Sequence, residues 1–161
     1  MPELIINHSQ LLELSAEILN QGSSFRFQAR GTSMTPLIRQ GDIITIQPVD
    51  LSDLRVGDVI LFQTAFDKLV AHRIIDIGVE NGQIQFVARG DAILGSGEKV
   101  HADMVLGQVV RIERGSRVMH LDMHYWRSLG ILWGKLAPFT LRCRSFRFAS
   151  GRCDLISNSV R

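Results

Sequence analysis

A serine in a short segment bounded by glycine and proline is the residue of this chain best suited to nucleophilic chemistry. Ser33 lies in Gly31-Thr32-Ser33-Met34-Thr35-Pro36, and His72 follows 39 residues later in Ala71-His72-Arg73. A serine hydroxyl is a poor nucleophile until a base within hydrogen-bond reach takes its proton. Histidine, with an unperturbed pKa of about 6.5, can do so at neutral pH. We therefore hypothesise a catalytic Ser33–His72 dyad. It requires that the fold bring both groups together in an open cleft.

The elements that must position these residues are one helix followed by many short strands. Apolar residues recur on one stripe of residues 9–21, which predicts a helix that Ser9 can cap and Gly22 can end. Asn81-Gly82 and Gly115-Ser116 each predict the turn of a hairpin. Many short strands joined by tight turns indicate a mainly β fold of coiled or barrel-like sheet. Strands are predicted over 25–30, 42–49, 58–63, 69–79, 83–88, 105–113 and 117–121.

The charge is distributed unevenly along the 161 residues, which fit one domain with a small appendage. Residues 1–110 carry 8 Lys+Arg and 13 Asp+Glu, a net charge of −5, whereas residues 111–161 carry 10 and 3, a net charge of +7. A basic C-terminal third indicates either an anionic contact or a solvated tail. Cys143 and Cys153 do not make a disulfide framework, and we interpret them as free thiols rather than as one local bridge.

The pattern changes near residue 122, where we place a domain boundary. Residues 123–161 are predicted to form a short apolar helix over 126–136, stopped by Pro138, and then a basic tail. Residues 126–148 either contact a membrane interface peripherally or pack on the β core. We see no signal peptide and no apolar run of the roughly 18–20 residues that spans a bilayer. The sequence therefore predicts a soluble, cytoplasmic protein, with at most this peripheral membrane contact.

A series of short blocks follows in order along the chain: Gly31-x-Ser33-Met34-x-Pro36, Gly41-Asp42, Val56-Gly57-Asp58-Val59-Ile60, His72-Arg73, Gly90-Asp91 and Leu106-Gly107-Gln108-Val109. Together these blocks resemble the signal peptidase I and self-cleaving repressor superfamily of serine peptidases. The resemblance covers about residues 24–113 and implies the coiled β-sheet core of those enzymes, here over 24–121 within a catalytic domain of residues 1–122. Housekeeping signal peptidases and repressors use lysine as the base, so His72 resembles the histidine branch found in endoplasmic-reticulum, archaeal and sporulation-type enzymes.

The resemblance also implies an acid that orients the histidine, as in a catalytic triad. Asp91 matches the aspartate of the family's Gly-Asp block. The family's second acid falls on Gly97 in this chain, with Glu98 beside it, so Asp91 and Glu98 are both open as the third residue. Arg73 is expected to pair with a carboxylate rather than to act in catalysis.

The oxyanion site departs from many signal peptidases, which carry a hydroxyl residue two positions before the nucleophile. Gly31 stands there, as glycine does in the self-cleaving repressors, so the backbone N–H of Ser33 would supply most of the oxyanion stabilisation. The expected substrate-binding and oxyanion residues are Gly31, the adjacent Thr32, and Met34, which is expected to pack beside the nucleophile. The Gly41-Asp42 and Gly57-Asp58 pairs are interpreted as structural turns before strands.

The Ser33–His72 pair and this resemblance together predict a serine peptidase that hydrolyses a peptide bond in a specific precursor peptide or protein, through a dyad or a triad. The alternative is a catalytically inactive binding or regulatory module on the same fold. A repressor-type switch is disfavoured, since a helix-turn-helix needs two helices and only about 23 residues precede the core, so we expect no sequence-specific nucleic acid partner. No cofactor or metal is implied, because His101, His120 and His124 lack metal-ligand spacing. The sequence leaves the oligomeric state open.

Overall fold

The computed structural model describes residues 8–121 of the chain. The predictions for residues 123–161, which include the helix at 126–136, Cys143 and Cys153, lie outside the described residues, as does the boundary near 122. The elements in chain order are α1 (His8–Asn20), β1 (Phe25–Gln28), β2 (Ile43–Gln47), the 3₁₀ turn η1 (Leu51–Asp53), β3 (Val59–Gln63), β4 (Leu69–Glu80), β5 (Gln83–Arg89), β6 (Glu98–His101), the 3₁₀ turn η2 (Ala102–Met104), β7 (Val105–Arg114) and β8 (Arg117–His120).

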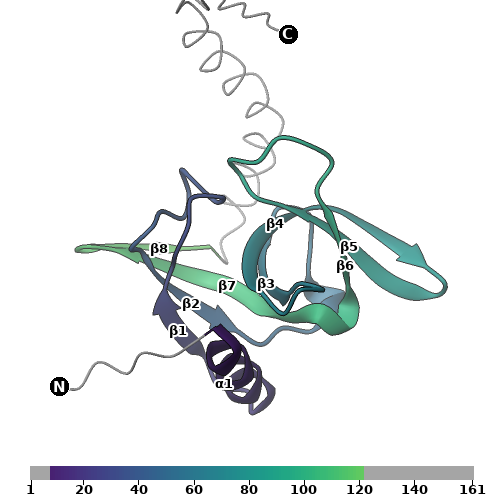
Figure 1. Cartoon of the computed structure of the whole chain (residues 1–161), viewed down its shortest axis with the longest axis horizontal. Coiled ribbons are helices and arrows are strands. Elements are labelled where there is room, and N and C mark those ends of the chain that lie inside the picture. Colours follow the sequence, from purple (N-terminus) through teal and green to yellow (C-terminus); the bar gives the residue numbers. More distant parts are fainter. Residues whose placement is uncertain (1–7, 122–161) are drawn as a thin grey trace, which may run out of the picture.

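All eight strands form one antiparallel sheet, which confirms the mainly β prediction. The strand order is β1-β2-β7-β3-β4-β5-β6, and β8 pairs with β7 beside this path. Figure 1 shows that the part formed by β1, β2 and β7 is open, whereas β3 to β6 curl round on themselves. Helix α1 lies against β1 and β7 at one side of the sheet (Figure 1). The result is a coiled sheet with an N-terminal helix, as the sequence indicates.

Strand β3 separates two hydrophobic cores, because its side chains are buried on both faces. Val59 and Leu61 belong to a first core that also contains Leu19 of α1. Ile60 and Phe62 point the other way, into a second core inside the curled part of the sheet. Successive side chains of a strand alternate between its faces, so one strand can serve both cores only if every position is apolar.

The hairpins form where their turn residues predict them. Asn81 and Gly82 both have positive φ, 53° and 79°, which is the backbone of the tight two-residue turn that joins β4 to β5. Gly115 lies in the turn between β7 and β8.

The strand that the sequence did not predict is β6, which has four residues of which only Val100 is buried. So short and polar a segment carries no alternation that sequence reasoning could detect.

The two Gly-Asp pairs are structural turns, which confirms their interpretation. Each precedes a strand, and each aspartate carboxylate accepts the backbone N–H three residues earlier: Asp42 from Arg39 at 2.8 Å and Asp58 from Arg55 at 2.9 Å. The glycine before each aspartate has a positive φ, 92° at Gly41 and 102° at Gly57, which a side chain would strain. The first of these turns ends the segment that carries Ser33.

Candidate active site

Ser33 lies in a loop that is closed on itself. We call residues 29–42 the Ser33 loop, because the backbone of Ala29 and that of the Gly41-Asp42 turn join its two ends. The Ala29 N–H donates to the Asp42 carbonyl at 2.7 Å, and the Gly41 N–H donates to the Ala29 carbonyl at 2.9 Å. Compact loops closed at the neck frequently carry functional residues. Ser33 itself is partly exposed at the surface of this loop.

Two buried side chains of the Ser33 loop hold it on the sheet. Met34 and Ile38, each 4% exposed, lie in the first core. The side chain of Met34 is therefore part of the core and is not accessible to a substrate, so its assignment to the substrate-binding residues is wrong. Gly31 and Thr32 are exposed, and Gly31 has a φ of 89°, so this end of the loop is open to solvent.

His72 lies on β4 opposite Ile60 of β3, and its ring centroid is 6.0 Å from that of Phe62. Both neighbours belong to the second core, so the imidazole is placed on that side of the sheet. The residue is only 9% exposed, and its Nδ1 atom is buried without a hydrogen-bond partner. The expectation that both groups stand in an open cleft is thus wrong for His72, because its side chain is buried against the second core.

Burial sets the protonation state of His72. Desolvation disfavours the imidazolium and lowers the pKa of His72 below its ordinary 6.5, while the negative charge of Asp91 opposes this with a smaller upward effect. The imidazole is therefore neutral at pH 7. A neutral imidazole is the form that can accept a proton from a serine hydroxyl.

Asp91 binds the neighbour of His72 rather than His72 itself. Arg73 Nε donates to Asp91 Oδ1 at 2.8 Å and Arg73 Nη2 donates to Asp91 Oδ2 at 2.6 Å. A third donor, Arg73 Nη1, reaches the Gly57 carbonyl at 2.8 Å. The pairing of Arg73 with a carboxylate is confirmed. The direct orientation of His72 by Asp91 is not what the geometry shows, since both carboxylate oxygens are bound to the guanidinium and His72 Nδ1 has no partner.

The turn after β5 connects this ion pair to the nucleophile loop. The Ala92 N–H donates to the Ser33 carbonyl at 2.8 Å, one residue beyond Asp91. The backbone of Gly90 is so close to Ser33 that an added Cβ would lie 2.6 Å from the Ser33 carbonyl oxygen. Gly90, Asp91 and Ala92 thus touch the Ser33 loop on one side and Arg73 of β4 on the other. Residues far apart in the sequence meet at this turn.

The contact made by Ala92 was not predicted from the sequence. A backbone N–H that binds a backbone carbonyl leaves no signature in residue types, so no signal could have identified it.

Glu98, the alternative acid, is exposed at the start of β6 opposite Ala88. At Gly97 an added Cβ would approach the Val87 and Ile75 side chains to 2.9 and 3.0 Å, so the position is already crowded. Asp91 is the acid whose charge acts on His72.

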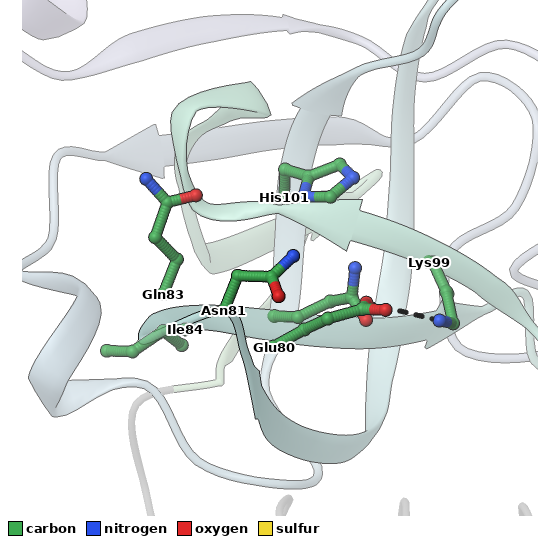
Figure 2. Close-up of a pocket in the computed structure, with 7 residues that line it drawn as sticks. Glu80, Asn81, Gln83, Ile84, Lys99 and His101 are labelled. Carbon is green, nitrogen blue, oxygen red and sulfur yellow. Dashed lines mark hydrogen bonds and ion pairs between the residues drawn. The ribbon is translucent and has the colours of Figure 1, made fainter.

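A polar pocket lies elsewhere, between the β4–β5 turn and β6 (Figure 2). Glu80 and Lys99 pair across it at 3.2 Å, and both side chains are largely exposed. None of the predicted site residues lines this pocket, and it contains no serine, threonine or cysteine that could act as a nucleophile. We therefore do not assign the catalytic chemistry to it. Its lining consists of Glu80, Asn81, Gln83, Ile84, Gln85, Lys99 and His101.

The described residues, 8–121, show neither a metal site nor a membrane-spanning helix. No three His, Cys, Asp or Glu side chains among them gather closely enough to hold a metal ion. No helix in that range combines the length and the apolar character needed to cross a membrane.

The close approach of Gly90 to Ser33 gives a testable prediction. Gly90→Ala is expected to cost about 1–3 kcal/mol in the free energy of unfolding, because the new methyl group meets a backbone oxygen that cannot step aside. Urea denaturation followed by circular dichroism measures the change. Gly78→Ala is the matched control, since Gly78 also lies in this sheet and has no atom within 4 Å of an added Cβ. Equal stability of the two variants would contradict the contact.

Comparison with known proteins identifies the family of the chain. The family model described as Peptidase S24-like matches residues 2–110. Signal peptidase I W of Bacillus subtilis (strain 168) is 35% identical over 60 residues, which make up 37% of this chain and 32% of that protein. The match thus spans about a third of the relative's length. Because the family model covers well over half of the sequence, the chain belongs to the Peptidase S24-like family.

Proposed function

We propose that this protein is a serine endopeptidase that cleaves one peptide bond in a specific precursor peptide or protein. The observation that carries the proposal is the Gly90–Ala92 turn, which is hydrogen-bonded to Ser33 and joined through Asp91 to the residue after His72. In a member of a peptidase family, this turn ties the loop of a partly exposed serine to the strand of a neutral histidine.

In the proposed reaction His72 is general base and then general acid. It takes the proton of the Ser33 hydroxyl as Oγ attacks the substrate carbonyl, and the backbone N–H of Ser33 stabilises the oxyanion. His72 then gives the proton to the leaving amine, and water hydrolyses the acyl-enzyme. The proposal requires the ring and the hydroxyl to meet in the substrate complex, since catalytic hydrogen bonds are often long before substrate binds. Asp91 acts through Arg73 as a positioning residue.

The edge of β4 supports a peptide as the substrate. β3 pairs with β4 over residues 69–73, whereas β5 pairs with it only from Arg73 onward. On the side away from β3, residues 69–72 have no partner strand within the described part of the chain. An extended peptide can add to such an edge through main-chain hydrogen bonds. Bound there, it would run past His72 along the strand that carries the base.

The test is mass spectrometry of a peptide library incubated with purified protein. The wild type is expected to release defined products, and Ser33→Ala is expected to release none, because the nucleophile is gone. Ser116→Ala, in the exposed turn between β7 and β8, is the control and should match the wild type. Products of equal yield from wild type and Ser33→Ala would overturn the proposal.

A second function, a catalytically inactive binding module, is favoured by a separate set of observations. His72 is nearly covered, its Nδ1 has no partner, and the carboxylate that could orient it is occupied by Arg73. Such a module would bind a peptide at the β4 edge without cleaving it. It predicts that wild type and Ser33→Ala retain the same library peptides intact with the same affinity.

A further inference from the structure

Arg114, at the end of β7, makes a second bidentate ion pair that holds the Ser33 loop. Arg114 Nε donates to Asp42 Oδ1 at 2.8 Å, and Arg114 Nη2 donates to Asp42 Oδ2 at 2.6 Å. The same Nη2 reaches the Leu37 carbonyl at 2.8 Å. We propose that Arg114 is a positioning residue for Ser33, which it holds in place through Asp42 and Leu37. This inference rests on the proposed function, because it assigns a role within the same site.

The contacts of Arg114 converge on the returning half of the Ser33 loop. Asp42 is only 4% exposed, and its Oδ2 atom also accepts the Arg39 N–H at 2.8 Å. One guanidinium thus fixes the loop at Leu37 directly, at Asp42 directly and at Arg39 through the carboxylate. Bidentate pairs of this kind combine charge with a fixed geometry that lysine cannot reproduce.

A short path of hydrogen bonds leads from these contacts to the nucleophile. The Ile38 N–H donates to the Met34 carbonyl at 2.9 Å, and the Thr35 N–H donates to the Thr32 carbonyl at 3.1 Å. A shift of Leu37 therefore moves the turn that contains Ser33. The Ser33 carbonyl itself is held by Ala92. The loop is thus fastened at Ser33 by the Gly90–Ala92 turn, and at Leu37 and Asp42 by Arg114.

Nothing in this arrangement requires Arg114 to touch a substrate. Its side chain is 29% exposed, and its Nε and Nη2 donors are directed to Asp42 and Leu37. Loss of Arg114 is therefore expected to slow the reaction of the serine while Ser33 and His72 themselves stay intact. Misplacement of a reacting group by about 1 Å can cost on the order of 100-fold in rate, and a partly retained loop should lose less.

The experiment measures the rate at which a fluorophosphonate probe labels Ser33. The mass of the intact protein reports the labelling. The temperature is one at which circular dichroism shows that all variants are folded. Arg114→Gln is expected to label about tenfold more slowly than wild type. Arg114→Lys keeps the positive charge but cannot form the bidentate pair. Its labelling rate is expected to lie between those of wild type and Arg114→Gln. Arg26→Gln is the matched control, since Arg26 makes the same kind of bidentate ion pair with Glu113, outside the Ser33 loop. It should label within about twofold of wild type.

Hydrogen exchange of the Thr35 and Ile38 amides is measured on the same proteins, and both should exchange faster in Arg114→Gln than in Arg26→Gln. Labelling of Arg114→Gln at the wild-type rate, even with a lower melting temperature, would overturn the positioning role. If the wild type does not label at all, the proposed function fails, and the exchange data decide the present inference alone. Unchanged exchange at both amides would then reject it, and faster exchange would uphold it.

Discussion

Replacement of Arg73 by methionine is expected to lower the free energy of unfolding by about 3–5 kcal/mol, because it leaves a buried carboxylate without its counter-charge. The side chains of Arg73 and Asp91 are 6% and 3% exposed, so water cannot take over the role of the guanidinium. The variant also loses the contact with the Gly57 carbonyl. Urea denaturation followed by circular dichroism measures the loss.

Two further variants separate the lone charge from lost packing. Arg26→Met makes the same chemical change in an exposed pair with Glu113 and is expected to cost far less, since water screens that pair. The double variant Arg73→Met/Asp91→Leu carries no unpaired charge and is expected to be more stable than Arg73→Met alone. A cost for Arg73→Met no larger than that for Arg26→Met would show that the Arg73–Asp91 pair is not buried in solution.

Replacement of His72 by glutamine is expected to slow the labelling of Ser33 by a fluorophosphonate probe by about 10²–10⁴-fold, the usual contribution of a general base. Glutamine is polar and of similar size, but it cannot accept the proton at neutral pH. The wild-type rate should fall in acid, because only the neutral imidazole is a base. Since burial holds the pKa of His72 below 6.5, this fall should be centred below pH 6.5. A fall centred above pH 6.5, or one that persists in His72→Gln, would contradict the assignment.

The same depressed pKa of His72 couples protonation to stability. Below pH 6.5 the histidine of the unfolded chain binds a proton that the buried ring of the folded chain resists. The unfolded state then binds more protons, so the free energy of unfolding decreases as the pH falls from 6.5 toward the pKa of the folded state. His72→Gln should lose this part of the pH dependence. Urea denaturation at several pH values between 5 and 8 on both proteins, chosen to bracket the unperturbed pKa of about 6.5, measures the difference.

Much of the fold follows from local pattern, and the site follows from it only in part. The apolar run of β3 and the Asn81-Gly82 turn determine their elements through burial and backbone preference. The partner of Asp91, by contrast, is not determined by local pattern. His72 and Arg73 are adjacent in sequence, and the choice between them depends on which side of β4 the turn after β5 approaches. A guanidinium offers Asp91 two parallel donors and a full charge, and it forms the stronger contact.

Burial of the imidazole could not be predicted for a related reason. The residues around His72 predict a strand, but whether a ring on that strand is covered depends on how far the sheet curls toward the second core. That curl arises from the twist of several strands together, and no single segment encodes it. The structure therefore changes the interpretation of His72 and Asp91, two of the three expected catalytic residues, and Ser33 stays partly exposed.

The polar residues of β6, which kept the sequence pattern from predicting that strand, protect one edge of the sheet from pairing with another chain. An edge strand presents unpaired backbone groups that can recruit another chain into an aggregate. β6 ends the strand order, has only four residues and carries Glu98, Lys99 and His101 as exposed side chains. Brevity and charge are two devices by which natural sheets discourage this association. The protein thus resists intermolecular strand pairing, the first step toward amyloid, at this edge.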